Sequence, residues 1–205
     1  MIRLMVGIAA LAALVSCTAP SGPVNDPKRD LGDFVLGHNI VVAPQFQKGP
    51  LSRPADKDEF IASMKNAIDA RFGRYDGDRT VHFGVNISGY VLAQTGVPLV
   101  LSPKSALIIT VTAWDDRAGA KFNDEAREFV VLESYTAPII GSGMTMSADE
   151  QMANLTYNAA AQIERWLYDN RACLVDDVPQ DAAKTCWKTT KQEQAELKKK
   201  VDQLR

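Results

Sequence analysis

The chain has 205 residues, a formal net charge of −2 at pH 7, and 46% hydrophobic residues. A chain of this length suffices for one domain of ordinary size, which buries enough surface to fold without a metal or a disulfide. The small net charge gives no field of a single sign, so no nucleic-acid partner is expected. The two histidines have no ligand-like spacing to each other or to a cysteine, so no metal and no cofactor are expected.

The first sixteen residues form a leader. Arg3 supplies a positive charge, and Leu4–Val15 is an unbroken run of apolar and small residues. Twelve such residues suit a signal peptide and are too few to span a bilayer, which takes roughly 20. The run ends at Leu14-Val15-Ser16-Cys17, which resembles the lipobox of bacterial lipoproteins. The resemblance implies removal of residues 1–16 and a diacylglycerol on the sulfur of Cys17; an ordinary secretory signal cut elsewhere is the alternative.

Residues 17–35 are expected to be the lipidated cysteine and a flexible tether. Thr18–Asp33 is rich in proline and glycine and shows no apolar periodicity. Fully extended, this stretch reaches about 50 Å, so the folded domain can stand clear of a membrane. The alternative is that part of the stretch packs on the domain. Thr18 directly after the anchored cysteine resembles lipoproteins that are sorted to the outer membrane, facing the periplasm.

Residues 36–170 are expected to form one α+β domain. Alternating or β-branched residues predict four strands, at 39–46, 80–93, 106–114 and 128–136. Apolar residues three and four apart predict two helices, over 56–72 and 147–170, each opened by a capping residue. The order β-α-β-β-β-α predicts two helices packed on one face of a four-stranded mixed sheet, because each element has one apolar face to bury.

The opposite face of this sheet is the expected partner-binding surface. In the strand over 80–93, the even-numbered residues place Tyr90 on the same side as His82 and Asn86. Trp114 is expected on that side of the next strand, and the apolar loop Val97–Leu101 is expected to contribute. A mixture of aromatic, aliphatic and small polar groups is the composition that interfaces use. The alternatives are that the face is merely solvated and that the loop belongs to the core.

No motif indicates catalysis. Gly141-Ser142-Gly143 precedes a helix cap and lacks the nucleophile-elbow pattern, and Asp76-Gly77-Asp78 lacks the remaining ligands of a calcium loop. Asp115-Asp116 lies in a polar turn, where no apolar surroundings raise a carboxyl pKa. No catalytic residue is therefore assigned, and the protein is not expected to be an enzyme.

Three arginines cluster around the end of the first predicted helix. They complement the negative end of the helix dipole or, alternatively, contact an anionic glycolipid or a phosphate. The three are Arg71, Arg74 and Arg79.

Residues 171–205 form a tail beyond the domain. Cys173 and Cys186 remain once Cys17 is assigned to the lipid, and an envelope compartment permits a disulfide between them. Two free thiols are the alternative. Apolar residues at helical spacing in the last part of the tail predict either a solvated helix or a short partner-binding helix.

The layout resembles small envelope lipoproteins of Gram-negative bacteria. The features that carry the resemblance are Cys17, the run Gly49–Arg53 before the first helix, and the helix sequence Glu150–Leu167. They are similar to the lipoprotein subunit of the lipopolysaccharide-assembly machine, to auxiliary lipoproteins of ABC transporters, and to lipoproteins of alphaproteobacterial type. The resemblance implies a non-enzymatic binding or assembly subunit that is anchored in the membrane and acts in envelope biogenesis or transport. A self-contained lipid-binding or structural lipoprotein is the alternative.

Overall fold

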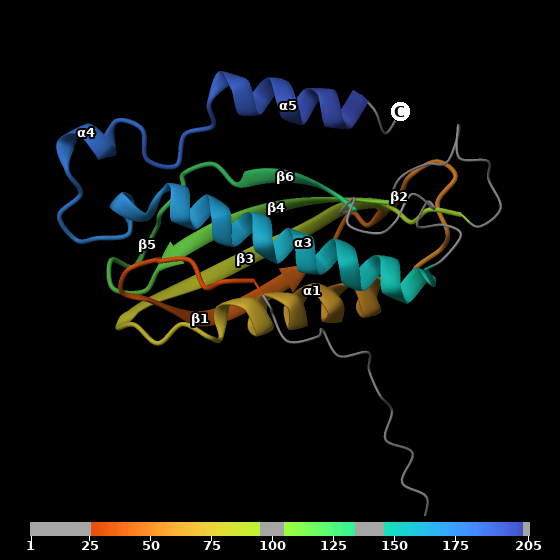
Figure 1. Cartoon of the computed structure of the whole chain (residues 1–205), viewed down its shortest axis with the longest axis horizontal. Coiled ribbons are helices and arrows are strands. Elements are labelled where there is room, and N and C mark those ends of the chain that lie inside the picture. The colour runs from red at the N-terminus through yellow and green to blue at the C-terminus, as the bar shows by residue number, and fades with distance from the viewer. Residues whose placement is uncertain (1–25, 95–104, 134–145, 203–205) are drawn as a thin grey trace, which may run out of the picture.

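The computed structural model describes residues 26–94, 105–133 and 146–202. Within these ranges the chain folds as an α+β domain with a mixed sheet (Figure 1). The strands are β1 (Phe34–Val42), β2 (Gln47–Lys48), β3 (Arg79–Val91), β4 (Ala106–Asp115), β5 (Ala120–Lys121) and β6 (Arg127–Leu132). The helices are α1 (Lys57–Phe72), α3 (Ala148–Asp169), α4 (Gln180–Ala183) and α5 (Lys191–Asp202), with a 3₁₀ turn at Arg171–Cys173. Cys17 and the loop Val97–Leu101 lie outside the described residues.

The sheet has six strands, so the predicted count of four is wrong. β1 runs parallel to β3, whereas β3, β4 and β6 pair in antiparallel order. The two strands missing from the prediction, β2 beside β3 and β5 beside β4, have two residues each. Two residues are too few to show the alternation from which a strand is predicted.

The helices α1 and α3 lie side by side on one face of the sheet (Figure 1). Asp56 caps α1 by accepting hydrogen bonds from the backbone N–H groups of Asp58 and Glu59, at 2.8 and 3.1 Å. Ser147 and Glu150 form the capping box of α3 that the sequence predicts. Under the helices, alternate residues of β3 and β4 are fully buried and form the core with the apolar stripes of both helices. We call the other side of the sheet the open face.

The end of the predicted tether packs on the domain. β1 begins at Phe34 rather than at Asn39, because the ring of Phe34 lies in the core against Phe72 and Phe83, with centroids 5.7 and 6.1 Å away. Leu31, still further toward the N-terminus, is also buried in the core. Of the two alternatives for this stretch, packing on the domain therefore holds for residues from 26 onward.

Tyr90 does not lie on the open face, so that part of the prediction is wrong. The register of β3 against β4 shifts between Ile87 and Gly89, which inserts an extra residue and reverses the alternation beyond it. Tyr90 consequently pairs with Leu107 on the helix-covered side and is only 5% exposed. Its ring stacks on Phe46 at 4.6 Å between centroids, and its hydroxyl accepts a hydrogen bond from the backbone N–H of Ala55 at 3.0 Å.

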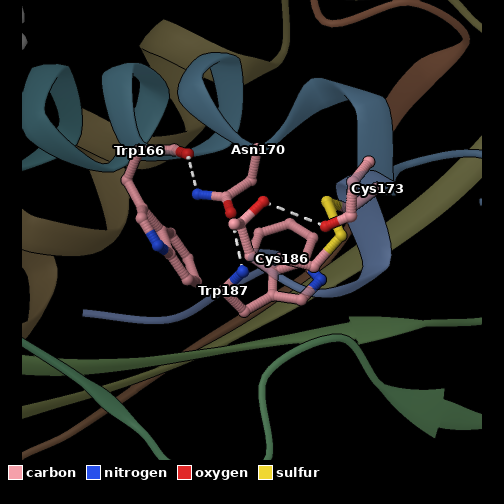
Figure 2. The surroundings of a disulfide bond; sticks show 7 residues. Trp166, Asn170, Cys173, Cys186 and Trp187 are labelled. Carbon is pink, nitrogen blue, oxygen red and sulfur yellow. Dashed lines mark hydrogen bonds between the residues drawn. A yellow bond between two sulfur atoms is a disulfide. The ribbon is translucent and has the colours of Figure 1, made fainter. Parts of the chain in front are cut away.

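The described part of the tail is held against the domain. A disulfide joins Cys173 to Cys186, whose Cα atoms are 5.9 Å apart, and Figure 2 shows it beside the end of α3. The next residue, Trp187, donates its backbone N–H to the side-chain oxygen of Asn170 at 2.7 Å, and its ring packs against Trp166. Among the described residues, no helix is long and apolar enough to cross a membrane.

Arg127 of β6 connects the sheet to the helix α5. It donates hydrogen bonds to Thr189 at 2.6 Å and to the carboxylate of Glu193 at 2.9 Å. β6 forms one edge of the sheet, and α5 lies along it (Figure 1). An unpaired strand edge invites pairing with another chain, and a helix laid beside it is one of the ways to protect it.

Candidate functional site

The open face carries large apolar side chains that water reaches. Ile40 is 60% exposed, Val42 46% and Trp114 39%. Ile40 and Val42 come from β1, whereas Trp114 lies two strands away on β4. Half-buried polar and small groups fill the space between them, from β3 and β4: His82, Asn86, Ser88, Thr110 and Thr112. The structure therefore places Trp114 where the sequence predicts it, and adds two aliphatic residues of β1 that the prediction missed.

Gly84 lies on the open face between β1 and β4 and carries no side chain. It pairs with Ile40 on one side and with Thr112 on the other. A Cβ atom added at Gly84 would meet no other atom within 4 Å, so the space above its backbone is open. The face thus has apolar residues at its two sides and room for a partner's side chain between them.

A pair of stacked histidines borders the face next to Trp114. His82 pairs with Trp114 across β3 and β4, and its ring stacks on His38 with 4.9 Å between centroids. The Nδ1 of His82 accepts the backbone N–H of His38 at 2.7 Å. In the neutral ring the proton is therefore on Nε2, which donates to the carboxylate of Asp116 at 3.1 Å. Both ring nitrogens of His82 are occupied, so its ring is held in place as a flat contact surface.

The described residues give no support for chemistry on this face. They contain no group of three or more histidines, cysteines and carboxylates that could hold a metal ion. The hydroxyl groups of Ser88 and Thr110 accept hydrogen bonds from the amide of Asn86, at 3.1 and 3.4 Å. What the arrangement can do is bury apolar area against a partner and offer hydrogen bonds around it.

A second cluster of charged residues lies between α1 and α3. The guanidinium of Arg71, only 1% exposed, donates to the carboxylates of Glu164 at 2.8 Å and Asp26 at 2.7 Å. Arg74 donates to the other oxygen of Glu164 at 2.6 Å. The hydroxyl of Tyr75 also donates to Glu164, at 2.7 Å, and burial together with that carboxylate raises the pKa of Tyr75 well above its ordinary value. Arg71 and Arg74 thus pair with carboxylates of this chain.

Arg79, the third arginine of the predicted cluster, belongs to a different network. It pairs with the buried carboxylate of Asp115 and with Asp176 of the tail, the latter at 2.8 Å. Arg117 also donates to Asp176, at 2.8 Å, so this network joins the start of β3, the end of β4 and the tail. The position of Arg79 is therefore set by its ion pairs and not by the dipole of α1. These ion pairs connect elements that are far apart in the sequence.

Two pockets are lined mainly by charged and polar side chains. One, of about 580 Å³, lies between residues 26–30 and the helices α1 and α3, and is lined in part by Asp26, Arg29 and Glu164. The other, of about 460 Å³, lies between α3, α5 and the β6 edge. Neither is the apolar cavity between sheet and helices that a lipid-binding domain requires.

Some of these residues were beyond the reach of sequence reasoning. Ile40 and Val42 are apolar residues of a short strand, and only the register with β3 shows that they face outward. Glu164 is one helical turn from Ala160 and Leu167 in the buried stripe of α3. A carboxylate in an apolar stripe is a detectable signal. Its partner on α1, Arg71, lies 93 residues away along the chain, and no local pattern connects the two.

Comparisons with known proteins assign no family. No family model matches the sequence, and no curated protein matches it. Among solved structures, a Caulobacter crescentus protein described as a lipoprotein is 12% identical over 62% of this chain and 91% of that one, with a TM-score of 0.34. A Xanthomonas campestris protein of family DUF330 is 12% identical over 66% and 86%, with a TM-score of 0.34. A minor lipoprotein of Acinetobacter baumannii is 19% identical over 67% and 95%, with a TM-score of 0.30.

Similarities of this size establish neither a family nor an activity for this chain. The resemblance to the lipopolysaccharide-assembly lipoprotein and to ABC-transporter auxiliary lipoproteins therefore stays a prediction.

Proposed function

We propose that the protein is a lipid-anchored lipoprotein of the bacterial envelope, held at the outer membrane and facing the periplasm. It acts without catalysis, as a binding subunit of an envelope assembly or transport complex. The lipobox ending at Cys17 supports the anchor. The open face supports the binding role, and the single observation that carries it is the exposure of Ile40, Val42 and Trp114 on one side of one sheet.

Three exposed large apolar residues on one sheet face distinguish it from an ordinary solvated face. A sheet face in contact with water carries mainly polar side chains, with the apolar side chains on the covered face. Here Ile40, Val42 and Trp114 break that pattern among polar groups. Tryptophan in particular is enriched among the residues that contribute most to binding. A mixture of aromatic, aliphatic and small polar groups is the composition that protein–protein interfaces use.

The alternative, a self-contained lipid-binding lipoprotein, fits the described residues less well. It needs an apolar cavity, and the place for one is between the sheet and the helices. There the side chains of Phe83, Ile87 and Leu107 are buried and pack directly against the helices. A closely packed interior leaves no room for an acyl chain.

The test is partner capture by cross-linking in intact cells. Ile40→Glu combined with Trp114→Glu places two charges on the open face, and charges buried against a partner without a counter-ion are costly. We expect the cross-linked products to fall at least tenfold. The matched control is Asn66→Glu, an exposed residue on the helix side of the molecule, which should leave them unchanged.

A second variant separates loss of binding from loss of folding. Gly84→Trp places a bulky side chain in the middle of the open face, and its Cβ has open space, so the fold should be retained. Normal cross-linking yield with both the double variant and Gly84→Trp, each shown to be folded by circular dichroism, would overturn the assignment of this face.

A further inference from the structure

The residues that connect the domain to the predicted anchor are fixed to the surface formed by α1 and α3. The carboxylate of Asp26 accepts hydrogen bonds from Arg71 at 2.7 Å and from the hydroxyl of Tyr157 at 2.9 Å. The backbone carbonyl of Asp26 accepts a third, from Arg74 at 2.7 Å. These donors come from α1, from the turn that follows α1, and from α3. Asp26 is therefore tied to both helices at once.

The following residues add further ties. The hydroxyl of Tyr75, which has one proton, lies 3.0 Å from the carbonyl oxygen of Arg29 as well as 2.7 Å from the carboxylate of Glu164. The ammonium of Lys28 lies 3.2 Å from the carboxylate of Asp76 and 4.8 Å from the centre of the Tyr75 ring. Leu31 is buried in the core. The contacts thus continue from Asp26 until the chain enters β1, and this stretch does not behave as a free linker.

The receiving side of the Asp26 contact is preorganised. Arg71 is almost fully buried and donates a hydrogen bond to the carboxylate of Glu164. Glu164 is also buried, and it accepts further hydrogen bonds from Arg74 and Tyr75. Asp26, in contrast, keeps 51% of its side chain exposed at the surface. Hydrogen bonds from Arg71 and Tyr157 hold the pKa of Asp26 below its usual range, so its carboxylate is charged at neutral pH. A charged arginine with fixed geometry is a strong hydrogen-bond donor to a carboxylate.

We propose that Asp26 clamps the tether to the α1–α3 surface and thereby turns the helix side of the domain toward the membrane. This inference rests on the proposed lipid anchor at Cys17. With the clamp closed, eight residues separate Cys17 from Asp26, and the two Cα atoms lie at most about 30 Å apart. If the clamp opens and the contacts of Lys28 and Arg29 are also released, the free chain extends to the buried Leu31 and spans at most about 45 Å. Closing the clamp shortens this reach by about a third.

The clamp also determines which face a partner can reach. α1 and α3 cover one side of the sheet, and the open face lies on the other side (Figure 1). The greatest reach of the connection from Cys17 to Asp26, about 30 Å, is less than the length of α3, whose 22 residues span about 33 Å. An anchor on so short a connection keeps the membrane on the helix side, so Ile40 and Trp114 point away from it into the periplasm.

The docking itself is tested without the lipid, in the soluble Cys17→Ala chain. Asp26→Ala removes the carboxylate, and we expect backbone amide exchange in residues 28–31 to rise at least tenfold while exchange in β1 stays unchanged. The matched control is Asp30→Ala, which removes a carboxylate whose only described hydrogen bond is local, to the N–H of Gly32 at 2.9 Å. Equal exchange in Asp26→Ala and the parent chain would overturn the clamp, whether or not the protein is lipidated.

The orientation is tested with the lipidated protein in vesicles of phosphatidylethanolamine and phosphatidylglycerol. A donor dye is attached either at position 66 on α1 or at position 112 on the open face, and energy transfer is measured to an acceptor on the lipid headgroups. We expect stronger transfer from position 66, and a difference that shrinks in Asp26→Ala. Equal transfer from both positions in the parent protein would overturn the orientation while leaving the docking result standing.

Discussion

The carboxylate of Glu164 is the centre of the hydrogen-bond network that joins α1 to α3 and includes Asp26 of the tether. This carboxylate receives Arg71, Arg74 and Tyr75 at hydrogen-bonding distance, and the residue is 1% exposed. A buried ion pair does not by itself stabilise a protein more than a well-packed apolar pair would. Breaking it from one side is different, because a charge is then left buried without its partner. Removing a single member of the network should therefore lower the free energy of unfolding by more than the intact network adds to it.

Glu164→Gln is expected to destabilise the domain by about 3 kcal/mol, the low end of what removing one partner of a buried pair costs. Glutamine keeps the size and a hydrogen-bonding oxygen, but Arg71 loses its main counter-charge. Urea unfolding followed by tryptophan fluorescence measures the change in the free energy of unfolding. Glu128→Gln, at an exposed position of β6, serves as the control and should shift the midpoint very little. A midpoint shared by Glu164→Gln and the parent would contradict the role given to this carboxylate.

Among the elements, β3 shows how one irregularity changes which residues are available. Before its register shift, Val81 and Phe83 point to the helices and His82 points to the open face. After the shift the even-numbered Tyr90 points to the helices as well. The sequence does not show where the bulge lies, because Ser88 fits the alternation of apolar and polar residues whether or not the strand bulges there. The sequence predicts that Tyr90 and Trp114 lie together on the open face. The structure places Tyr90 in the core and Trp114 on the open face.

The bulge predicts that the same substitution destabilises the domain far more at Tyr90 than at Trp114. Tyr90→Glu places a carboxylate in the core and is expected to cost about 4 kcal/mol or more, because the charge has no partner there. Trp114→Glu acts at an exposed position and should cost about 1 kcal/mol. Thermal unfolding of the two variants side by side measures the difference. If both melt at the same temperature, Tyr90 is not in the core and the register shift is misplaced.

The tail is an element whose attachment the sequence only partly indicates. Cysteine count and compartment favour the bond between Cys173 and Cys186, which the structure contains. Nothing in the sequence pattern connects Trp187 with Trp166, or Arg127 with Glu193, since these pairs are distant along the chain. The disulfide places Trp187 next to the end of α3, where its ring finds aromatic neighbours (Figure 2). A short covalent loop thus brings a distant helix to the edge of the sheet.

At the scale of the whole molecule, local patterns predicted the helices well and the sheet less completely. Both long helices have the starts that Asp56 and Ser147 indicate, because a cap and a 3.6-residue period are local signals. The two-residue strands, the register shift in β3 and the exposure of Ile40 are set by pairing between strands. The contact of Asp26 with Arg71 spans 45 residues and leaves no local trace. Sequence reasoning therefore found the open face but only one of its three exposed apolar residues.

The anchor sets the position of the whole molecule, and Cys17→Ala tests it directly. Each buried CH₂ of an acyl chain contributes about 0.8 kcal/mol, and stable anchoring takes more than one chain. Without the sulfur of Cys17 no diacylglycerol can be attached, so the variant should appear in the soluble periplasmic fraction or accumulate as the unprocessed precursor. Cell fractionation with immunoblotting measures both outcomes.

The matched control for Cys17→Ala replaces the other two cysteines, as Cys173→Ser with Cys186→Ser. This variant loses the disulfide of the tail but keeps the attachment site, so it should remain with the membrane. If Cys17→Ala instead stays in the outer-membrane fraction with the mobility of the parent protein, the lipobox assignment is wrong. The clamp at Asp26 would then join a segment to the domain without orienting it on a membrane, and the open face would need a different reason to point toward its partner.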